Sequence, residues 1–388
     1  MSEPAAVDLA PILQILLAGA AVAAVPLGWL QLRARRQSPG RWLHALTVLT
    51  LFLTFDLVLF GAFTRLTDSG LGCPDWPGCY GNASPAGASS HISAAQAVMP
   101  DGPVTHHKAW IEMVHRYMAT GVGALILTLT VAGWRQWRRN PVRSSQVHPW
   151  WPTVTLLWVC VQGAFGALTV TMKLFPAIVT MHLLGGLLLL VLLTIQAQRQ
   201  GQGVHGLPPV SIDGRTRRLL WLVAALLLLQ LALGGWVSTN YAVLVCSDFP
   251  TCQGSWWPSM RFDQGFEVWR PLGMTGDGTL VSFAALTAIH YTHRLMAYVV
   301  LAALWLLALR LSRNPGLRPQ ARWIAVLAVL QLASGLGNVV LGWPLLAALL
   351  HTGGAAALVL VITWALAASR AVPVHDTVGR AVALGGLR

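Results

Sequence analysis

The residues with the clearest chemical potential in this sequence are histidines within long apolar segments. Four stand out, and they are His115, His182, His293 and His351. Each lies about six or seven residues after the expected start of a helix, so at 1.5 Å per residue all four lie ~10 Å below the same membrane surface. One such histidine is more often a buried hydrogen-bonding residue, but four at matched depth, two in each half of the chain, favour a ligand-binding role.

Two histidines on facing helices predict a particular kind of ligand. An iron porphyrin accepts axial imidazoles, whereas zinc takes three or four ligands per site. No matching set of cysteines or carboxylates accompanies the histidines, so haem iron is the favoured metal. Small residues follow two of the histidines and would admit either a flat macrocycle or a neighbouring helix. They are Gly185, Gly186, Gly353 and Gly354.

One difference between the two histidine pairs indicates where acid–base chemistry would occur. Glu112 stands three residues before His115, whereas His290 stands three residues before His293. Residues at this spacing share a helix face. The first half therefore has an acid–base candidate beside its histidines, while the second half is more typical of a carrier. The alternative is that Glu112 is simply solvated at the membrane interface.

Three arginines near the same depth are candidates for binding acidic groups. Arg116 and Arg294 directly follow histidines, and Arg65 ends an apolar segment. Because guanidinium groups bind carboxylates strongly, contacts with the propionates of a haem are one interpretation. Extension of the side chains towards the interface is the other. Asp56, deep in an apolar segment, has no counterpart in the second half and is either hydrogen-bonded structure or part of a proton path.

The segments that position these residues must cross a membrane. Of the 388 residues, 55% are hydrophobic and 10% charged, whereas a soluble protein carries about a quarter charged residues. Apolar blocks of roughly 20 residues can cross a ~30 Å hydrocarbon core. We therefore predict an all-α polytopic membrane protein with spans at residues 9–31, 43–66, 109–134, 150–171, 176–197, 218–239, 284–309, 322–342 and 345–368.

The net charge of +13 indicates topology and excludes a nucleic-acid partner, because the positive charges gather in alternate short loops and the tail. These arginines are Arg33, Arg35, Arg36, Arg41, Arg135, Arg138, Arg139, Arg143, Arg199, Arg215, Arg217, Arg218, Arg310, Arg313, Arg318, Arg322, Arg370, Arg380 and Arg388. The positive-inside rule makes these regions cytoplasmic. With nine spans, the N-terminus lies outside and the C-terminus inside, and both long loops, 67–108 and 240–283, lie on the outer, periplasmic face.

Each long loop contains the same short cysteine frame. The first reads CPDWPGC, from Cys73 to Cys79, and the second reads CSDFPTC, from Cys246 to Cys252. An oxidising outer compartment predicts a disulfide within each frame. Unpaired or metal-binding thiols are the alternative. The Asp and Pro inside each frame are typical turn residues. Cys160, in the middle of an apolar span, is expected to be a packing residue.

The doubled frame belongs to a larger duplication. GAFTRLTDSGLGC corresponds to GGWVSTNYAVLVC, and IEMVHRYMA corresponds to IHYTHRLMA. The match predicts two pseudo-symmetric four-helix bundles, related as a parallel repeat about an axis along the membrane normal. The predicted organisation is an extra N-terminal helix and loop (1–42), a first half (43–198), a cytoplasmic linker (199–217), a second half (218–370) and a cytoplasmic tail (371–388).

These motifs together resemble haem A synthase, the Cox15/CtaA family of membrane oxidoreductases. The matching segments are TRLTDSGLGCPDWPGCYG, EMVHR, MHLLGG, HYTHR and LLHTGG, which cover residues 43–368 roughly. The resemblance implies an enzyme of the bacterial inner membrane that oxidises a ring methyl group of haem O to a formyl group. The product, haem A, would supply haem–copper terminal oxidases. Expected partners are the farnesyltransferase that makes haem O, an electron acceptor and membrane lipid.

The resemblance also implies roles for individual residues. His293 and His351 would hold the iron of a bound haem b, and His115 and His182 would be ligands of substrate haem O. Glu112 matches the carboxylate of the family's E-x-x-H-R motif and would be catalytic. The first cysteine pair, Cys73 and Cys79, matches a pair linked to haem transfer or folding.

Two other classes of protein would share some of these features. A di-haem b electron-transfer protein would explain four histidines, but not Glu112 or the paired outer loops. A transporter built from a parallel repeat would explain the duplication and would bind no pigment.

Overall fold

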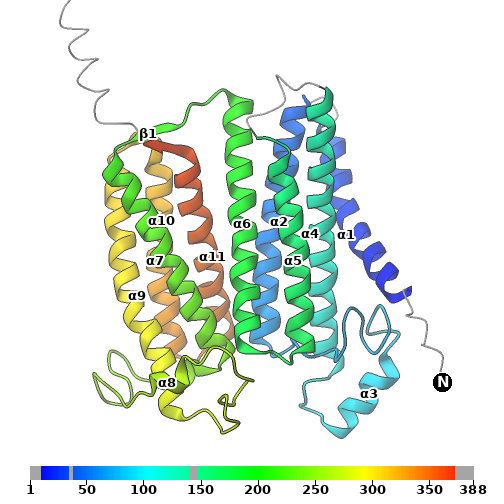
Figure 1. Ribbon diagram of the computed structural model, residues 1–388, viewed down its shortest axis with the longest axis vertical. Coiled ribbons are helices and arrows are strands. Elements are labelled where there is room, and N and C mark those ends of the chain that lie inside the picture. Colours follow the sequence, from blue (N-terminus) through cyan, green and yellow to red (C-terminus); the bar gives the residue numbers. More distant parts are fainter. Residues whose placement is uncertain (1–9, 35–37, 140–146, 372–388) are drawn as a thin grey trace, which may run out of the picture. The chain divides into compact units, whose positions relative to one another are not determined.

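The computed structural model of this chain describes residues 10–34, 38–139 and 147–371 (Figure 1). Residues 1–9 of the predicted N-terminal region and the predicted tail beyond 371 lie outside the described residues, as do Arg35, Arg36, Arg143, Arg380 and Arg388. Within the described residues, nine helices are long and apolar enough to cross a membrane. The prediction of an all-α polytopic membrane protein is confirmed.

These nine helices follow the predicted spans in order. They are α1 (Ala10–Ala34), α2 (Pro39–Leu66), α4 (His106–Arg139), α5 (Trp150–Thr171), α6 (Pro176–His205), α7 (Gly214–Thr239), α9 (Phe283–Ser312), α10 (Arg318–Val340) and α11 (Leu345–Ala368). The largest differences are at the ends of α4 and α6, which extend beyond the predicted spans. Helical hydrogen bonds continue where polar residues leave the hydrocarbon region, so hydropathy underestimates helix length.

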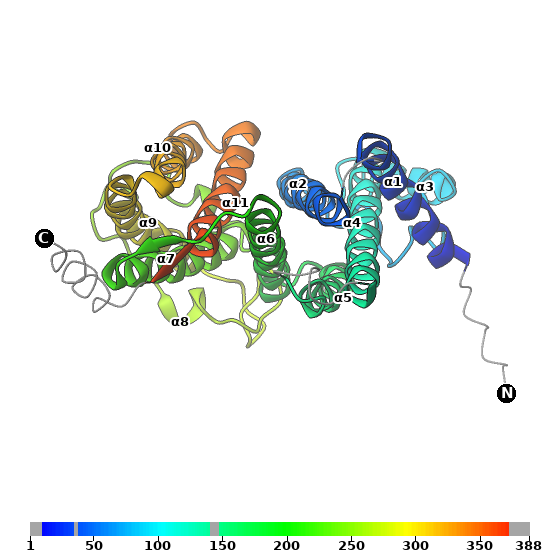
Figure 2. The same ribbon diagram turned by 90° about the horizontal axis from the view of Figure 1, so that it is seen from above.

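The chain divides into two compact units, and the first comprises Met1–Leu189 and Phe266–Val281. Its central helix is α4, which packs against α1, α2 and α5 (Figure 2). Glycine permits the close approach of α1: a Cβ atom added to Gly19 would lie 2.4 Å from Cγ2 of Thr120. The extra N-terminal helix is therefore packed into the first unit through small residues, as is common for membrane helices.

The second unit comprises Leu190–Gly265 and Ser282–Arg388. Helices α7, α9, α10 and α11 pack in that order around a shared core, with α11 returning to α7 (Figure 2). Large apolar side chains fill the core, among them Leu220, Leu304, Leu307 and Ile324, each no more than 1% exposed. This unit is a closed four-helix bundle.

The connection between α6 and α7 is shorter than the predicted 199–217 linker. Strand β1 (Val210–Ile212) lies within it and pairs in parallel with β2 (Ser369–Ala371), which follows α11. Asp213 then caps α7 by accepting a hydrogen bond from the backbone amide of Thr216 at 3.0 Å. Hydrogen bonds from Thr216 lower the pKa of Asp213 to about 2. The connector is thus an ordered segment that pairs with the residues following α11.

The two long loops also carry short helices that hydropathy does not predict. The first contains α3 (Ser89–Val98), and the second contains η1 (Ala242–Leu244) and α8 (Phe262–Gly265). Part of the second loop, Phe266–Val281, belongs to the first unit, where the rings of Trp269 and Phe175 lie 4.7 Å apart. The second loop therefore does not serve the second half alone, as the repeat would imply.

Candidate functional site

The first unit contains His115 on α4 and His182 on α6. Each imidazole lies against a glycine of another helix. A Cβ atom added to Gly61 on α2 would lie 3.0 Å from Cε1 of His115, and one added to Gly166 on α5 would lie 3.5 Å from Cε1 of His182. The ring of Phe60 stacks on that of His115 with centroids 6.3 Å apart. The glycines leave hollows that receive the imidazole rings.

The second unit repeats this arrangement with His293 on α9 and His351 on α11. Their ring centroids lie 6.5 Å apart, with an interplanar angle of 84°. A Cβ atom added to Gly234 on α7 would lie 3.0 Å from Cε1 of His293, and one added to Gly335 on α10 would lie 3.2 Å from Cε1 of His351. Thus each of the four imidazole rings packs against a glycine of a neighbouring helix, where a larger side chain would crowd the ring. No local sequence pattern indicates this pairing of glycine and histidine, although Gly61 and Gly234 hold equivalent places in the repeat.

The imidazole nitrogens of the four histidines are suited to binding the iron of a haem. The Nδ1 atoms of His115, His182 and His293 are buried and have no hydrogen-bond partner among the described residues. The four histidine residues as a whole are only half-buried, so a bound group can still reach them. His351 differs, because its Nδ1 lies 3.0 Å from the hydroxyl of Ser334. A second bond of this kind fixes the tautomer of a metal-binding imidazole.

Glutamine side chains pack beside the histidines. Nε2 of Gln331 donates to the carbonyl of His351 at 2.9 Å, and Nε2 of Gln230 donates to that of His293 at 3.2 Å. A Cβ atom at Gly354 would lie 2.4 Å from Nε2 of Gln331, and one at Gly185 would clash with Gln162 in the same way. At these two glycines the structure favours the helix-packing interpretation over an approaching macrocycle.

Glu112 lies inside the first unit and is 3% exposed, so the alternative that it is solvated at the interface is wrong. Its Oε2 accepts a hydrogen bond from the backbone amide of Cys73 at 2.8 Å. Its Oε1 forms an ion pair with Arg116, one turn further along α4. The carboxylate therefore joins the first long loop to the helix that carries His115.

Arg116 holds the same loop through backbone carbonyls. Its Nη1 donates to the carbonyl oxygens of Asp75 and Pro77 at 3.0 Å each and to that of Gly78 at 2.5 Å. Arg294 does the same in the second unit, donating to Thr251 at 2.7 Å. These arginine–carbonyl contacts, which we call the arginine clasps, are neither of the two roles predicted from the sequence, propionate contact and extension to the interface. Propionate contacts of both arginines stay a prediction.

His290 occupies the place of Glu112 in the second unit. Its Nδ1 lies 2.9 Å from the carbonyl oxygen of Ala242, so this nitrogen is the donor. Its Nε2 lies 3.4 Å from Nη2 of Arg294 and accepts from it. The second loop is therefore held by a neutral imidazole where the first is held by a carboxylate.

The two cysteine frames have the same internal structure. Cys73 bonds to Cys79, and Cys246 bonds to Cys252. An aspartate side chain closes each turn: Asp75 accepts from the amides of Tyr80 and Gly81 at 2.6 and 2.7 Å. Asp248 accepts from the amides of Gln253 and Gly254 in the second frame. The Thr251 hydroxyl and these amides lower the pKa of Asp248 to about 2.

Two other predicted residues lie away from the clasps. Nη1 of Arg65, at the end of α2, lies 3.9 Å from Oδ1 of Asp68, and Nζ of Lys108 lies 3.7 Å from Oδ2 of the same residue. Asp56 is half-buried on α2. Its two interpretations stay open.

Comparison with known proteins identifies the family. The model of the COX15-CtaA family, described as cytochrome oxidase assembly protein, matches residues 44–363. The chain belongs to this family. It is 37% identical to the heme A synthase of Shewanella oneidensis over 323 residues, which cover 81% of this chain and 92% of that protein. It is 28% identical to the heme A synthase of Caulobacter vibrioides over 364 residues, covering 86% and 96% of the two chains.

The family match includes every residue of the two histidine sites. It also includes both disulfides and both arginine clasps, whereas α1 precedes it. The packing of α1 against α4 is therefore an addition to the part that the family model describes.

Proposed function

We propose that this protein oxidises a ring methyl group of haem O to a formyl group and so produces haem A. The main support for the proposal is a single difference between two sites that otherwise match. A buried carboxylate, Glu112, lies one turn from the histidine of one site, and a neutral imidazole, His290, lies one turn from that of the other. Membership of a family whose relatives are heme A synthases supplies the reaction.

The first unit is the proposed substrate site, with His115 and His182 as the ligands of substrate haem. Conversion of the methyl group with water gives the formyl group, four protons and four electrons. Positive charge develops on the carbon as hydride or hydrogen leaves, and a nearby carboxylate stabilises it electrostatically. Glu112 also serves as a base towards the incoming water. Its ion pair with Arg116 favours the ionised form that both roles need.

The second unit is the proposed cofactor site, with His293 and His351 as the ligands of haem b iron. Haem b held there would supply one-electron chemistry, with an external acceptor taking the electrons. Gln230, Gln331 and Ser334 position the two histidines by hydrogen bonds to their carbonyls and to Nδ1 of His351. In this proposal the first cysteine pair shapes the entrance for substrate haem, and Arg65, Arg116 and Arg294 are the candidates for contacts with its propionates.

The wider setting is proposed from charge and chemistry. The protein lies in the bacterial inner membrane with its N-terminus outside, its arginine-rich loops in the cytoplasm and both disulfide loops in the periplasm. Haem O arrives from the farnesyltransferase that makes it. The proposed division into a catalytic half, 43–198, and a haem b half, 218–370, follows the duplication and gives each half one histidine pair.

Mass analysis of haem extracted from the purified protein tests this function. The expected result is haem b together with haem O, an oxidised intermediate or haem A, and the two kinds of haem should respond to different histidine substitutions. Haem b alone at two per chain would instead support the di-haem electron carrier. No haem in protein made with ample haem supply would overturn both.

A further inference from the structure

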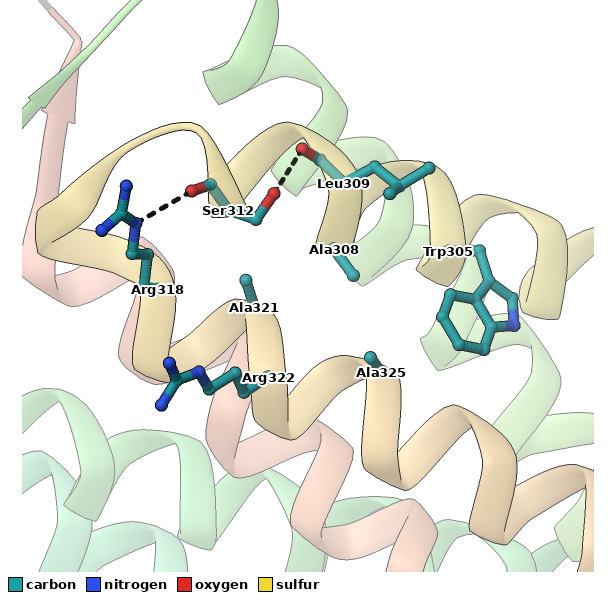
Figure 3. A pocket seen from close by; sticks show the side chains of 8 residues that line it. All are labelled: Trp305, Ala308, Leu309, Ser312, Arg318, Ala321, Arg322 and Ala325. Atoms are coloured by element: carbon teal, nitrogen blue, oxygen red, sulfur yellow. Dashed lines mark hydrogen bonds between the residues drawn. The ribbon is translucent and has the colours of Figure 1, made fainter.

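The second unit has a hollow far from its histidines, between the end of α9 and the start of α10. Its volume is about 340 Å³ (Figure 3). Small residues create it: Ala308 on α9 faces Ala321 and Ala325 on α10, and Ala308 and Ala321 are only 5% and 4% exposed. Two helices that meet through alanines leave a groove along their outer seam.

The groove has a charged end and an apolar end. Figure 3 shows the guanidinium groups of Arg318 and Arg322 on one side and the indole of Trp305 on the other. The two arginines are one turn apart and share a face of α10. Trp305 and Leu309 are 44% and 61% exposed and lie within the membrane-spanning part of α9. From Trp305 to the end of α9 the helix rises ~10 Å.

The arginines at the charged end have no acidic partner in the part of the chain that the structure describes. Arg318 donates through Nε to the carbonyl of Ser312 at 3.3 Å, and neither Arg318 nor Arg322 forms an ion pair. Nearby Arg310 differs, since its Nη2 lies 3.3 Å from Asp213 and its Nε donates to Thr216. The charge of Arg310 is thus paired with an acidic residue, whereas the charges of Arg318 and Arg322 at the groove are available to a ligand.

We propose that this groove binds an anionic phospholipid. The phosphate group lies against Arg318 and Arg322, and one acyl chain follows the groove past Leu309 to Trp305. Arginine pairs bind phosphate oxygens strongly, and basic pockets between membrane helices are known sites for acidic lipid headgroups. An acyl chain is the apolar group that the membrane offers to this seam. The site is independent of the proposed haem chemistry.

Lipid retention in the purified full-length protein tests the proposal. Native mass spectrometry should find bound phosphatidylglycerol or cardiolipin. Loss of two charges near a membrane surface weakens binding by about 30-fold, so the R318Q/R322Q double variant should lose this lipid. The matched control is R138Q/R139Q, which removes two arginines from the end of α4 and should keep it. Ala325→Leu, which fills the groove without changing charge, should also reduce retention, with haem content unchanged as evidence of folding.

Thermal unfolding of delipidated protein distinguishes the sources of phosphate. Added phosphatidylglycerol should raise the unfolding temperature, and the double variant should need about 30-fold more lipid for the same rise. Phosphatidylcholine and inorganic phosphate should have little effect. Equal stabilisation by phosphatidylcholine would overturn the role of the arginines, and equal stabilisation by inorganic phosphate would overturn the role of the groove. Unchanged lipid retention in the double variant would overturn the site itself.

Discussion

The two long loops that carry the disulfides differ in one of the side chains that contact them. Both have a disulfide, a turn closed by aspartate and an arginine that binds loop carbonyls. In the first unit the remaining contact comes from Glu112, whose carboxyl group also pairs with Arg116. In the second it comes from His290, a neutral donor to the carbonyl of Ala242.

This comparison shows which part of a duplicated scaffold is free to change. The glycine hollows and arginine clasps depend on backbone geometry, and both units keep them. The residue three positions before the first histidine of each pair needs only one polar contact with the loop, which either a carboxylate or an imidazole provides. Charge can therefore differ between the units without loss of the fold, and we expect chemistry to follow that difference.

The largest effect should come from removing histidines one unit at a time. Loss of second-sphere partners alone costs metal sites 10- to 100-fold in affinity, so loss of a ligand should weaken haem binding by at least about 100-fold. His293→Ala should therefore lose haem b, and His115→Ala should keep haem b but lose bound substrate haem. Haem extraction and absorption spectra measure both. If the two variants lose the same haem, the proposed difference between the units is wrong.

Substitution of Glu112 should separate its charge from its contact with the loop. Glu112→Gln still accepts from the amide of Cys73 but carries no charge, so activity should fall by about 10²- to 10⁴-fold with haem b retained. His290→Gln is the matched change in the second unit and should have a much smaller effect. Conversion of haem O by the purified variants is the measurement. Full activity of Glu112→Gln with inactive Glu112→Ala would show that the residue only anchors the loop.

Replacing the glycine beside a histidine should weaken haem binding in that unit and leave the other unit unaffected. A Cβ atom at Gly61 or Gly234 would meet an imidazole at 3.0 Å, and overpacking of this kind costs about 1–3 kcal/mol. Gly61→Ala should weaken substrate haem binding, and Gly234→Ala should weaken haem b binding. Gly163→Ala is the control because its Cβ atom would meet nothing within 4 Å. Equal haem contents in all three variants would contradict this account.

The smallest effect concerns acid sensitivity of the second loop. The pKa of Asp248 is lowered to about 2 from an ordinary value of 3.8. A lowered pKa means that the stabilisation is fully present above about pH 4 and is lost as pH falls through about 2. Protection of the amides of Gln253 and Gly254 from hydrogen exchange, measured relative to the intrinsic rate at each pH, should fall over that range, with no such change in Asp248→Asn. Protection that is independent of pH in the unsubstituted protein would exclude this role.

Much of the architecture could be predicted from local sequence features. Uninterrupted apolar segments predict the spans because every backbone polar group in hydrocarbon must be bonded within its own helix. The four histidines were found because a polar residue in such a segment is expensive and rare. The cysteine frames predict local disulfides because only five residues lie between the partners, which leaves little choice of geometry.

The clasps depended on tertiary structure. Glu112 and Cys73 are 39 residues apart, and no local pattern indicates that the carboxylate accepts from that amide. The same holds for Arg116 and the loop carbonyls, and for Phe266–Val281, which belongs to the first unit although its sequence lies in the second half. Such contacts join segments whose approach depends on how whole helices pack. The sequence by itself determined the spans and the candidate ligands, whereas packing decided which polar groups meet.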